Sequence, residues 1–412
     1  MKTYDVLVIG GGASGMMAAG RAAELGKRVL LLEKNAKLGE KLAITGGGRC
    51  NITNAEEDER LFLSKYGEAD KFLHTTFSQF GVKDTFSFFE SRQLPLKVEA
   101  YKRAFPSTER ATDVVAALSQ YLASGKVDVR TGVTVERILA AGKRIEKVET
   151  SIGDFSARAY VLATGGVSHP ETGSTGDGFS WLAQLGHTIA KPTPTVVPLR
   201  VKEGWVKSLA GVSLPSMKIT FFARGEKKFS RTGVLLFTHF GISGPTILNS
   251  AGKVSDLLHE GVVTAFVDLF PGADQGALDR KMTELFDANK NKLLRNVLKD
   301  MVPPGTSETL LSLLPDIDPE TKVHSVTKEN RKELGGLLKR VPMTITGLMG
   351  FDRAVVADGG LPLTEVDTRA MRSRLYENLF VTGDLLHIRR PSGGYSLQLC
   401  WTTGFVAGSH VS

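Results

Sequence analysis

The first forty residues constrain the fold more than any other part of the chain. YDVLVIG, from Tyr4 to Gly10, is a continuous apolar run, typical of a strand buried on both faces. Glycines at positions 10, 12 and 15 follow in a G-x-G-x-x-G pattern, and AGRAAELG then predicts a helix that ends at Gly26. KRVLLLEKN predicts a second buried strand, which ends at Glu33. This order of strand, glycine loop, helix, strand and acid predicts the βαβ unit of a dinucleotide-binding α/β domain.

This unit predicts specific contacts with a dinucleotide. Gly10 is expected to form the tight turn, Gly12 to let the backbone approach a pyrophosphate, and Gly15 to let the helix pack on the strand. The free N–H groups at the helix start are expected to face the phosphates. Glu33 is expected to accept hydrogen bonds from the adenosine ribose, which disfavours the 2′-phosphate of NADP here. The predicted contacts in this unit are Gly10, Gly12, Ala13, Ser14, Gly15, Glu33 and Lys34. The alternative is a glycine turn in an unrelated α/β protein.

FAD and NAD both use this motif, and the segment after Glu33 distinguishes between them. In an NAD dehydrogenase another plain helix and strand would usually follow, but KNAKLGEKLAITGGGRCNITN predicts a glycine-rich polar loop. Such a loop suits FAD, a long cofactor that continues past its pyrophosphate toward a ring. Gly46, Gly47 and Gly48 are expected to let the main chain lie against the pyrophosphate and the ribityl chain.

Three polar residues follow these glycines. Arg49 is predicted to pair with a phosphate or to orient a substrate, with a structural ion pair as the alternative. Cys50 stands where disulfide reductases carry a redox cysteine, but the other cysteine, Cys400, lies far along the chain in a predicted helix. We therefore expect Cys50 to be a small packed residue beside the flavin, and a catalytic thiol is the alternative. Asn51 is included in the predicted cofactor site, although asparagine also caps turns.

Later segments fit the same cofactor. Residues 126–138 alternate like a pair of strands, and Val135 is expected to lie against the adenine. A buried strand beginning at Ala159 leads into Thr164, Gly165 and Gly166, which predicts a second close approach of the backbone.

The C-terminal segment is predicted to complete the site. A strand there precedes Gly383 and Asp384, and Asp384 is expected to hold a ribityl hydroxyl. A helix is predicted to begin near Tyr395, with its N-terminus facing the N1 and O2 edge of the flavin, where it would stabilise the charge of the reduced ring. The predicted contacts are Gly393, Gly394, Tyr395, Ser396 and Leu397, and the alternative is a glycine turn before a core helix.

Composition limits the class of protein. The chain has 412 residues, enough for two or three domains, and it is 42% hydrophobic and 23% charged, as globular proteins are. Two cysteines exclude a disulfide framework and predict a reducing cytoplasm. The apolar N-terminal run is expected to be a strand rather than a signal peptide, and no apolar run of about 18 residues predicts a membrane span. No Cys/His cluster has metal-ligand spacing, so no metal is predicted.

With these motifs the chain resembles the BaiN-like family of FAD flavoproteins. The resemblance rests on GGGASG, TGGGRCNITN, ATGG at 163–166, FTHFGISGPTIL at 237–248, VADGGLPLTEVD at 356–367 and TGD…SGGYSLQ, and it covers nearly the whole chain. It implies a Rossmann-like FAD-binding domain of the two-dinucleotide-binding-fold type. This domain is expected over residues 1–190 and 343–412. An inserted substrate domain is expected over 191–342, β-rich over 191–272 and helical over 273–341.

The chain departs from this family in one loop. The family usually has a glutamate and an acidic, glycine-bearing loop where this chain reads GDLLHIRRPSGG. Asp384 is one methylene shorter and is expected to keep the role of the glutamate. His387, Arg389 and Arg390 make the loop basic, which suits an anionic substrate, a phosphate or NADPH if the loop faces the flavin. A solvated surface loop is the alternative.

These patterns lead to three hypotheses of function. The first is an FAD-dependent, NAD(P)H-linked oxidoreductase that moves a hydride through flavin N5 between NAD(P)H or a small organic substrate and an acceptor. Its candidate catalytic or substrate-contacting residues are Arg49, Cys50, His239 and Arg389. The second is an RNA-modifying enzyme, related to the family's dihydrouridine synthases, which the net charge of +8 favours and the lack of interleaved aromatic residues disfavours. The third is a non-catalytic flavin-binding scaffold. None assigns an oligomeric state.

Overall fold

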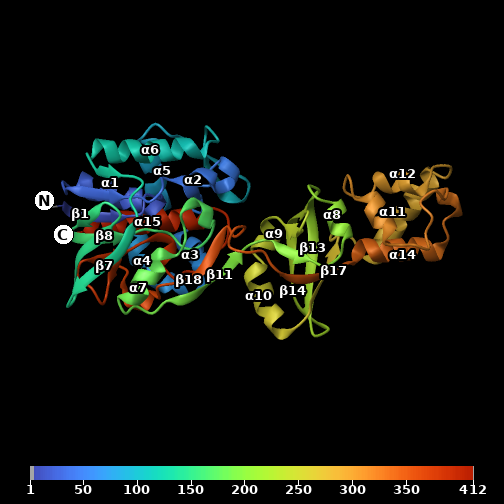
Figure 1. The fold of residues 1–412 in the computed structure, drawn as a ribbon. Coiled ribbons are helices and arrows are strands. Elements are labelled where there is room, and N and C mark those ends of the chain that lie inside the picture. The colour runs from blue at the N-terminus through green and yellow to red at the C-terminus, as the bar shows by residue number, and fades with distance from the viewer. Residues whose placement is uncertain (1–3, 412) are drawn as a thin grey trace. The chain divides into compact units, whose positions relative to one another are not determined.

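Residues 4–411 are described in the computed structural model of the chain. Two units can be distinguished by their internal contacts. Residues up to Thr193 and from Val355 onward form the first unit, and Pro194–Ala354 form the second. Each unit has its own hydrophobic core, and Figure 1 follows the chain from the first unit through the second and back. The sequence-based boundaries at 190/191 and 342/343 remain predictions of domain organisation.

A seven-stranded sheet forms the centre of the first unit. Its order is β19-β20-β21-β10-β1-β2-β6, and the five strands from β21 to β6 are parallel. The parallel strands are β1 (Tyr4–Ile9), β2 (Val29–Leu32), β6 (Asp128–Arg130), β10 (Ala157–Leu162) and β21 (Leu379–Val381). Strands β19 (Val366–Asp367) and β20 (Arg372–Ser373) form an antiparallel edge. Because parallel sheets are covered on both faces, the apolar residues of β1 and β2 are buried, and only Asp5 of β1 is half-buried.

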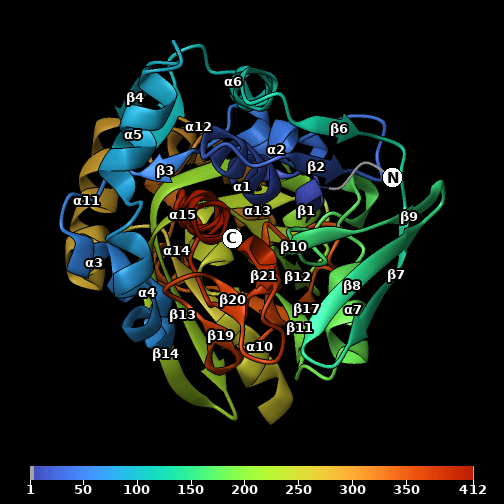
Figure 2. The ribbon, with the colours of Figure 1, turned by 90° about the vertical axis from the view of Figure 1, so that its left-hand side faces the viewer.

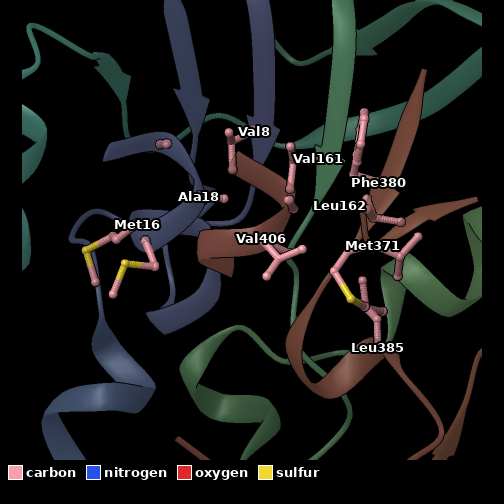
Figure 3. Packing of buried hydrophobic residues seen from close by; sticks show 14 of the residues in the cluster. Val8, Met16, Ala18, Val161, Leu162, Met371, Phe380, Leu385 and Val406 are labelled. Atoms are coloured by element: carbon pink, nitrogen blue, oxygen red, sulfur yellow. The ribbon is translucent and has the colours of Figure 1, made fainter. Parts of the chain in front are cut away.

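The register of these strands builds the core. Leu31, Val8, Val161 and Phe380 are paired in one row across four neighbouring strands, and all four are buried. Figure 3 shows three of them, Val8, Val161 and Phe380, with Val406 from the last helix nearby. Because these strands are parallel, their carboxyl ends lie at the same edge of the sheet.

Helix α1 (Ala13–Glu24) connects β1 to β2, and helix α15 (Tyr395–His410) lies beside it (Figure 2). A Cβ on Gly404 would lie 2.4 Å from the carbonyl oxygen of Ser14, and one on Gly408 would lie 2.4 Å from that of Ala18. The two helices therefore run in the same direction at a separation that only glycine permits.

Other elements surround this centre. The helices are α2 (Glu40–Ile44), α3 (Glu59–Leu63), α4 (Asp70–Phe77), α5 (Val82–Glu90), α6 (Ala111–Ser124) and α7 (Asp177–Gln184). One three-stranded sheet contains β3 (Thr53–Asn54), β4 (Leu96–Glu99) and β5 (Arg103–Pro106), and another contains β7 (Val135–Ala141), β8 (Arg144–Thr150) and β9 (Gly153–Phe155). The chain leaves by β11 (Ala190–Val196) and returns by β18 (Val356–Gly360), which pair as a two-stranded sheet.

Two local predictions were wrong. The polar loop predicted after Glu33 contains α2 and a 3-10 turn, Thr45–Gly48. A five-residue helix is marginal alone, but Leu42 is buried and its carbonyl accepts a hydrogen bond from Thr45 Oγ1. The strand pair predicted over residues 126–138 consists of β6 and β7, which belong to different sheets.

The second unit is a closed barrel in the order β12-β15-β14-β13-β16-β17. Its strands are β12 (Leu199–Val201), β13 (Ser213–Ala223), β14 (Glu226–Thr238), β15 (Gly241–Ser243), β16 (Val263–Asp268) and β17 (Val341–Leu348). Its helices are α8 (Trp205–Ser208), α9 (Pro245–Leu248), α10 (Ala251–Glu260), α11 (Gln275–Ala288), α12 (Leu294–Lys299), α13 (Ser307–Ser312) and α14 (Lys328–Lys339). Helices α11 to α14 lie between β16 and β17 in the sequence, and Lys339 Nζ fastens the end of α14 to Asp268 at 2.6 Å. The predicted fold class is confirmed.

Among residues 4–411, no helix is both long enough and apolar enough to cross a membrane.

Candidate dinucleotide site

The three motif glycines have different surroundings at the carboxyl end of β1. Gly10 has a φ of +104°, and a Cβ there would lie 2.6 Å from the carbonyl oxygen of Ala163. A Cβ on Gly15 would lie 1.9 Å from the carbonyl oxygen of Gly10. A Cβ on Gly12 would meet no atom within 4 Å. The first and third glycines are therefore required by packing, while Gly12 leaves open space at the start of α1, where the N–H groups of Ala13 and Ser14 begin the helix.

Glu33 is held at the end of β2 by two backbone groups. Its Oε2 accepts a hydrogen bond of 2.7 Å from the N–H of Gly11, and its Oε1 accepts one of 2.8 Å from the N–H of Asn35. The side chain is buried. Each carboxylate oxygen keeps a lone pair for a further donor, so the group can still bind hydroxyls.

A pocket opens beside Glu33. It is lined by Ile9, Gly10, Leu32, Glu33, Lys34, Val133, Thr134, Val135, Thr164, Gly173, Thr175, Asp177 and Trp181. Five separate segments contribute, and they include the predicted residues Lys34, Val135 and Thr164. Thr164 Oγ1 is buried and has no hydrogen-bond partner. A hydroxyl in this state is suited to a ligand that supplies the missing partner.

One wall of this pocket was missed by the sequence interpretation. Val133, Thr134, Gly173, Thr175, Asp177 and Trp181 carry no motif. Only their closeness in sequence to predicted site residues could have indicated them. Val133 and Thr134 directly precede Val135, and the other four lie at most fifteen residues after Gly166.

The glycines at 46, 47 and 48 form a left-handed turn. Their φ values are +58°, +68° and +86°. Cβ atoms on Gly47 and Gly48 would meet no atom within 4 Å, whereas one on Gly46 would lie 2.9 Å from the backbone nitrogen of Asn51. The turn therefore has an exposed main-chain surface that only glycine forms without strain.

Arg49 makes contacts on the β4–β5 side of this turn. Its guanidinium pairs with Glu99 and, at 3.2 Å, with Glu109, and it lies over the ring of Phe105 at 4.3 Å. These contacts match the structural ion pair weighed as the alternative for Arg49. A role with phosphate or substrate remains a prediction.

Cys50 is fully buried and left-handed, with a φ of +59°. Burial raises the pKa of the Cys50 thiol to about 12, and burial likewise raises that of Cys400 to about 12. Both thiols are therefore protonated near neutral pH, which suits packed residues better than nucleophiles.

The segment from Asn51 to Asn54 is tied to the start of α15. With its amide oriented to suit its neighbours, Asn51 accepts a hydrogen bond of 3.0 Å from the N–H of Gly394. Asn54 Nδ2 donates to the carbonyl of Gly393 at 3.2 Å, and Thr53 Oγ1 donates to Gln398 Oε1 at 2.6 Å. Gly393 and Gly394 have φ values of +112° and +101°. The segment that follows the Gly46–Gly48 turn is thus adjacent in space to Gly393 and Gly394.

Tyr395, Ser396 and Leu397 form the first turn of α15. The carbonyl of Tyr395 accepts a hydrogen bond from Tyr66, and Leu397 packs against the core. Ser396 instead points to Asp384, to which its Oγ donates at 3.4 Å.

Asp384 is the centre of a charged cluster at the end of β21. Lys41 Nζ lies 3.1 Å from its Oδ2, and the guanidinium of Arg390 pairs with its Oδ1. Burial alone would raise the pKa of Asp384, but Lys41 and Arg390 outweigh this effect and lower it to about 2. The carboxylate is therefore charged at all ordinary pH values.

The remaining predicted glycines lie around this cluster. A Cβ on Gly165 would lie 3.3 Å from Lys41 Nζ, and one on Gly166 would lie 3.3 Å from the carbonyl oxygen of Asp384. Gly383 has a φ of +63°, and its Cβ would lie 2.8 Å from Ser14 Oγ. Segments from β1, β10 and β21 therefore meet at one edge of the sheet, where ligands bind in open α/β folds.

Two basic residues of the loop after Asp384 form ion pairs with carboxylates. Arg390 is buried and also donates to the carbonyl of Ile388 and to Ser396 Oγ. Arg389 is exposed and pairs with Asp358 at 3.0 Å. The charge of Arg390 is therefore internal, and the charge of Arg389 is balanced by a carboxylate.

His239 lies in the other unit, in the turn after β14, where its ring contacts Phe240. Within residues 4–411, no group of three or more His, Cys, Asp or Glu side chains is arranged to hold a metal ion.

Comparisons with known proteins connect this architecture to a family. The model of the HI0933-like protein Rossmann domain matches residues 4–410. A 3-dehydro-bile acid delta(4,6)-reductase of Clostridium scindens is 30% identical over 404 residues, 97% of each chain. A ribosomal RNA dihydrouridine synthase of Haemophilus influenzae is 26% identical over 418 residues, 100% of each chain.

A solved structure shares the fold. The 3-ketosteroid delta1-dehydrogenase of Sterolibacterium denitrificans superimposes with a TM-score of 0.56 at 14% identity, over 100% of this chain and 99% of that chain. This likeness concerns the fold alone. The family model spans nearly all of the described residues, and the chain belongs to the HI0933-like Rossmann family.

Proposed function

We propose that the protein is an FAD-dependent oxidoreductase that passes a hydride through flavin N5. One observation carries the proposal. The segments that follow β1, β10 and β21 are far apart in the sequence and meet at the carboxyl edge of the parallel strands, and glycines at positions 12, 47 and 48 leave open main chain. The reductase name of a relative that matches over 97% of both lengths supports the same chemistry.

The adenosine half of FAD fits the pocket beside β2. Glu33 is oriented by two backbone N–H groups and keeps acceptor capacity for ribose hydroxyls. Val135 supplies an apolar wall for adenine, and the unpartnered Thr164 Oγ1 supplies a polar group. In this proposal Glu33 orients the ribose, and the pocket excludes a 2′-phosphate by its charge.

The pyrophosphate and ribityl chain fit the glycine segments. The open space at Gly12 adjoins the N-terminus of α1, whose free N–H groups and dipole favour anions. Asp384 is an acceptor for a ribityl hydroxyl. Lys41 beside it adds a positive charge that favours the anionic pyrophosphate.

The ring is proposed to lie at the start of α15. Gly404 of α15 lies beside Ser14 of α1. Because α15 begins nine residues before Gly404 and α1 begins one residue before Ser14, the start of α15 extends eight residues, or about 12 Å at the helical rise, beyond the start of α1. This offset suits a cofactor whose pyrophosphate lies at one helix start and whose ring lies at the other. The N–H groups of the first turn of α15 would stabilise negative charge on the reduced ring. The bound flavin supplies hydride chemistry, while the protein orients it and tunes its charge.

The hydride donor is proposed to be NADH or NADPH, and the acceptor a small organic substrate. Anaerobic mixing of the FAD-loaded protein with each nucleotide tests the donor, since reduction bleaches the yellow colour. Reoxidation by a conjugated steroid ketone then tests the acceptor. Bleaching by either nucleotide supports the proposal, and a colour unchanged by both contradicts the NAD(P)H part of it.

A second candidate is reduction of uracil in RNA. It is favoured by two relatives named ribosomal RNA dihydrouridine synthase, which match over 98–100% of both lengths, and by the net charge of +8. Reoxidation of the reduced protein by ribosomal RNA, but not by the steroid ketone, would select this candidate.

A further inference from the structure

The pocket beside Glu33 is bordered by a loop that the proposed function does not use. We name residues 168–177 the covering loop. It contains a 3-10 turn, Pro170–Thr172, and left-handed residues at His169, Gly173 and Gly176. Gly173, Thr175 and Asp177 of this loop line the pocket opposite Glu33 and Lys34.

Two residues that follow β2 fasten the covering loop. Lys34 Nζ donates to Thr175 Oγ1 at 2.5 Å and to Asp177 Oδ2 at 2.7 Å. Asn35 Nδ2 donates to the carbonyl of Thr172 at 2.9 Å. The fastening therefore consists of an ion pair and hydrogen bonds between two walls of the same pocket.

These contacts are exposed enough to open without disturbing the core. The Lys34 and Asp177 side chains keep 28% and 39% of their exposure. Neither side chain belongs to the buried core of the first unit. Partly exposed polar contacts of this kind open at lower free energy than a packed core does.

We propose that Lys34, through Thr175 and Asp177, holds the covering loop over the adenosine half of FAD and sets the rate at which the cofactor leaves. The inference rests on the proposed FAD function. Lys34 and Asp177 are positioning residues here, because they act through the loop. Since Asp177 balances the charge of Lys34, the pair retains the ligand without adding a free cation to the pocket rim.

The test measures release of FAD from the full-length, FAD-loaded protein after dilution. K34A and D177N are expected to release FAD about three- to fivefold faster than the wild type, because each breaks the partly exposed ion pair. T175V is expected to release it about two- to threefold faster, because it removes one hydrogen bond. The control K37A changes an exposed lysine three residues from Lys34 and outside the pocket, and is expected to release FAD at the wild-type rate. In K34A/D177A the rate is expected to match K34A, because the ion pair is lost only once.

Other outcomes separate this inference from the function on which it rests. If the wild type retains FAD and K34A releases it at the same rate, the inference is overturned and the proposed function stands. If K34A fails to fold, D177N and T175V decide, because they leave Lys34 in place; wild-type rates in both would overturn the inference. A wild-type protein that holds no FAD overturns both.

Discussion

At the scale of single residues, the glycines of the candidate site have different roles. Gly15 lies where a methyl group would collide with the backbone, whereas Gly12 lies where it would meet open space. The sequence motif predicted both glycines, because close approach of main chain is what the motif encodes. It could not predict that Arg49 pairs with Glu99 of β4 and with Glu109, because that pairing depends on how distant segments fold.

The two glycines allow a matched pair of substitutions. G15A is expected to lower the free energy of unfolding by about 3 kcal/mol, because its Cβ would lie 1.9 Å from a carbonyl oxygen. G12A is expected to change it by less than about 1 kcal/mol but to weaken FAD binding at least about tenfold, because its methyl group would occupy the pyrophosphate space. Urea unfolding and flavin titration measure the two effects. Tight FAD binding by G12A would contradict the proposed location of the pyrophosphate.

Asp384 predicts a pH dependence. Its folded-state pKa is lowered from 3.8 to about 2, so its contribution to stability is present above about pH 4 and is lost as the pH falls to about 2. The difference between these two pKa values corresponds to about 2 kcal/mol in the free energy of unfolding. D384N is therefore expected to lose less unfolding free energy than the wild type over this interval, in urea titrations at several pH values. E57Q, which changes an exposed carboxylate, should follow the wild type. Parallel curves for D384N and the wild type would exclude this account of the cluster.

At the scale of elements, the positions of α1 and α15 determine where the candidate site lies. The sequence predicted β1, α1, β2 and α15 because their periodicity and glycine punctuation are local. The short helix α2 was missed because its stability comes from tertiary burial of Leu42 rather than from propensity. The covering loop was missed because its role depends on Lys34, which lies about 140 residues away in sequence.

The contact between α1 and α15 can be tested with one methyl group. G404A is expected to destabilise the protein by about 2–3 kcal/mol, because its Cβ would lie 2.4 Å from the carbonyl oxygen of Ser14. FAD affinity is expected to fall with it, since the offset of the two helix starts would change. The control G252A lies in α10, where the nearest atom is 4.0 Å away, and is expected to gain up to about 1 kcal/mol. Equal stability of the two variants would mean that the close packing of α1 and α15 is not needed.

At the scale of the whole molecule, each of the two units has its own hydrophobic core. The β-rich character of the second unit was predicted from alternating residues, but the closed barrel was not, because closure depends on β12 pairing with both β15 and β17. All the residues assigned here to FAD belong to the first unit.

This division predicts the outcome of an excision. Replacing residues 194–354 by a short glycine-serine linker is expected to leave a folded protein that still binds FAD, because the retained Ala190 and Pro192 of β11 lie beside Gly359 of β18 and keep the two cut ends close. Its FAD affinity, measured by flavin titration, is expected to stay within about tenfold of the full chain. A folded excised protein that no longer binds FAD would show that the second unit contributes to the cofactor site.

The most direct measurement is the FAD content of the purified full-length chain after incubation with excess cofactor and gel filtration. We expect one FAD for each polypeptide, with a visible flavin spectrum that G12A loses more readily than the wild type. A wild-type chain that is folded by circular dichroism and emerges colourless would contradict it.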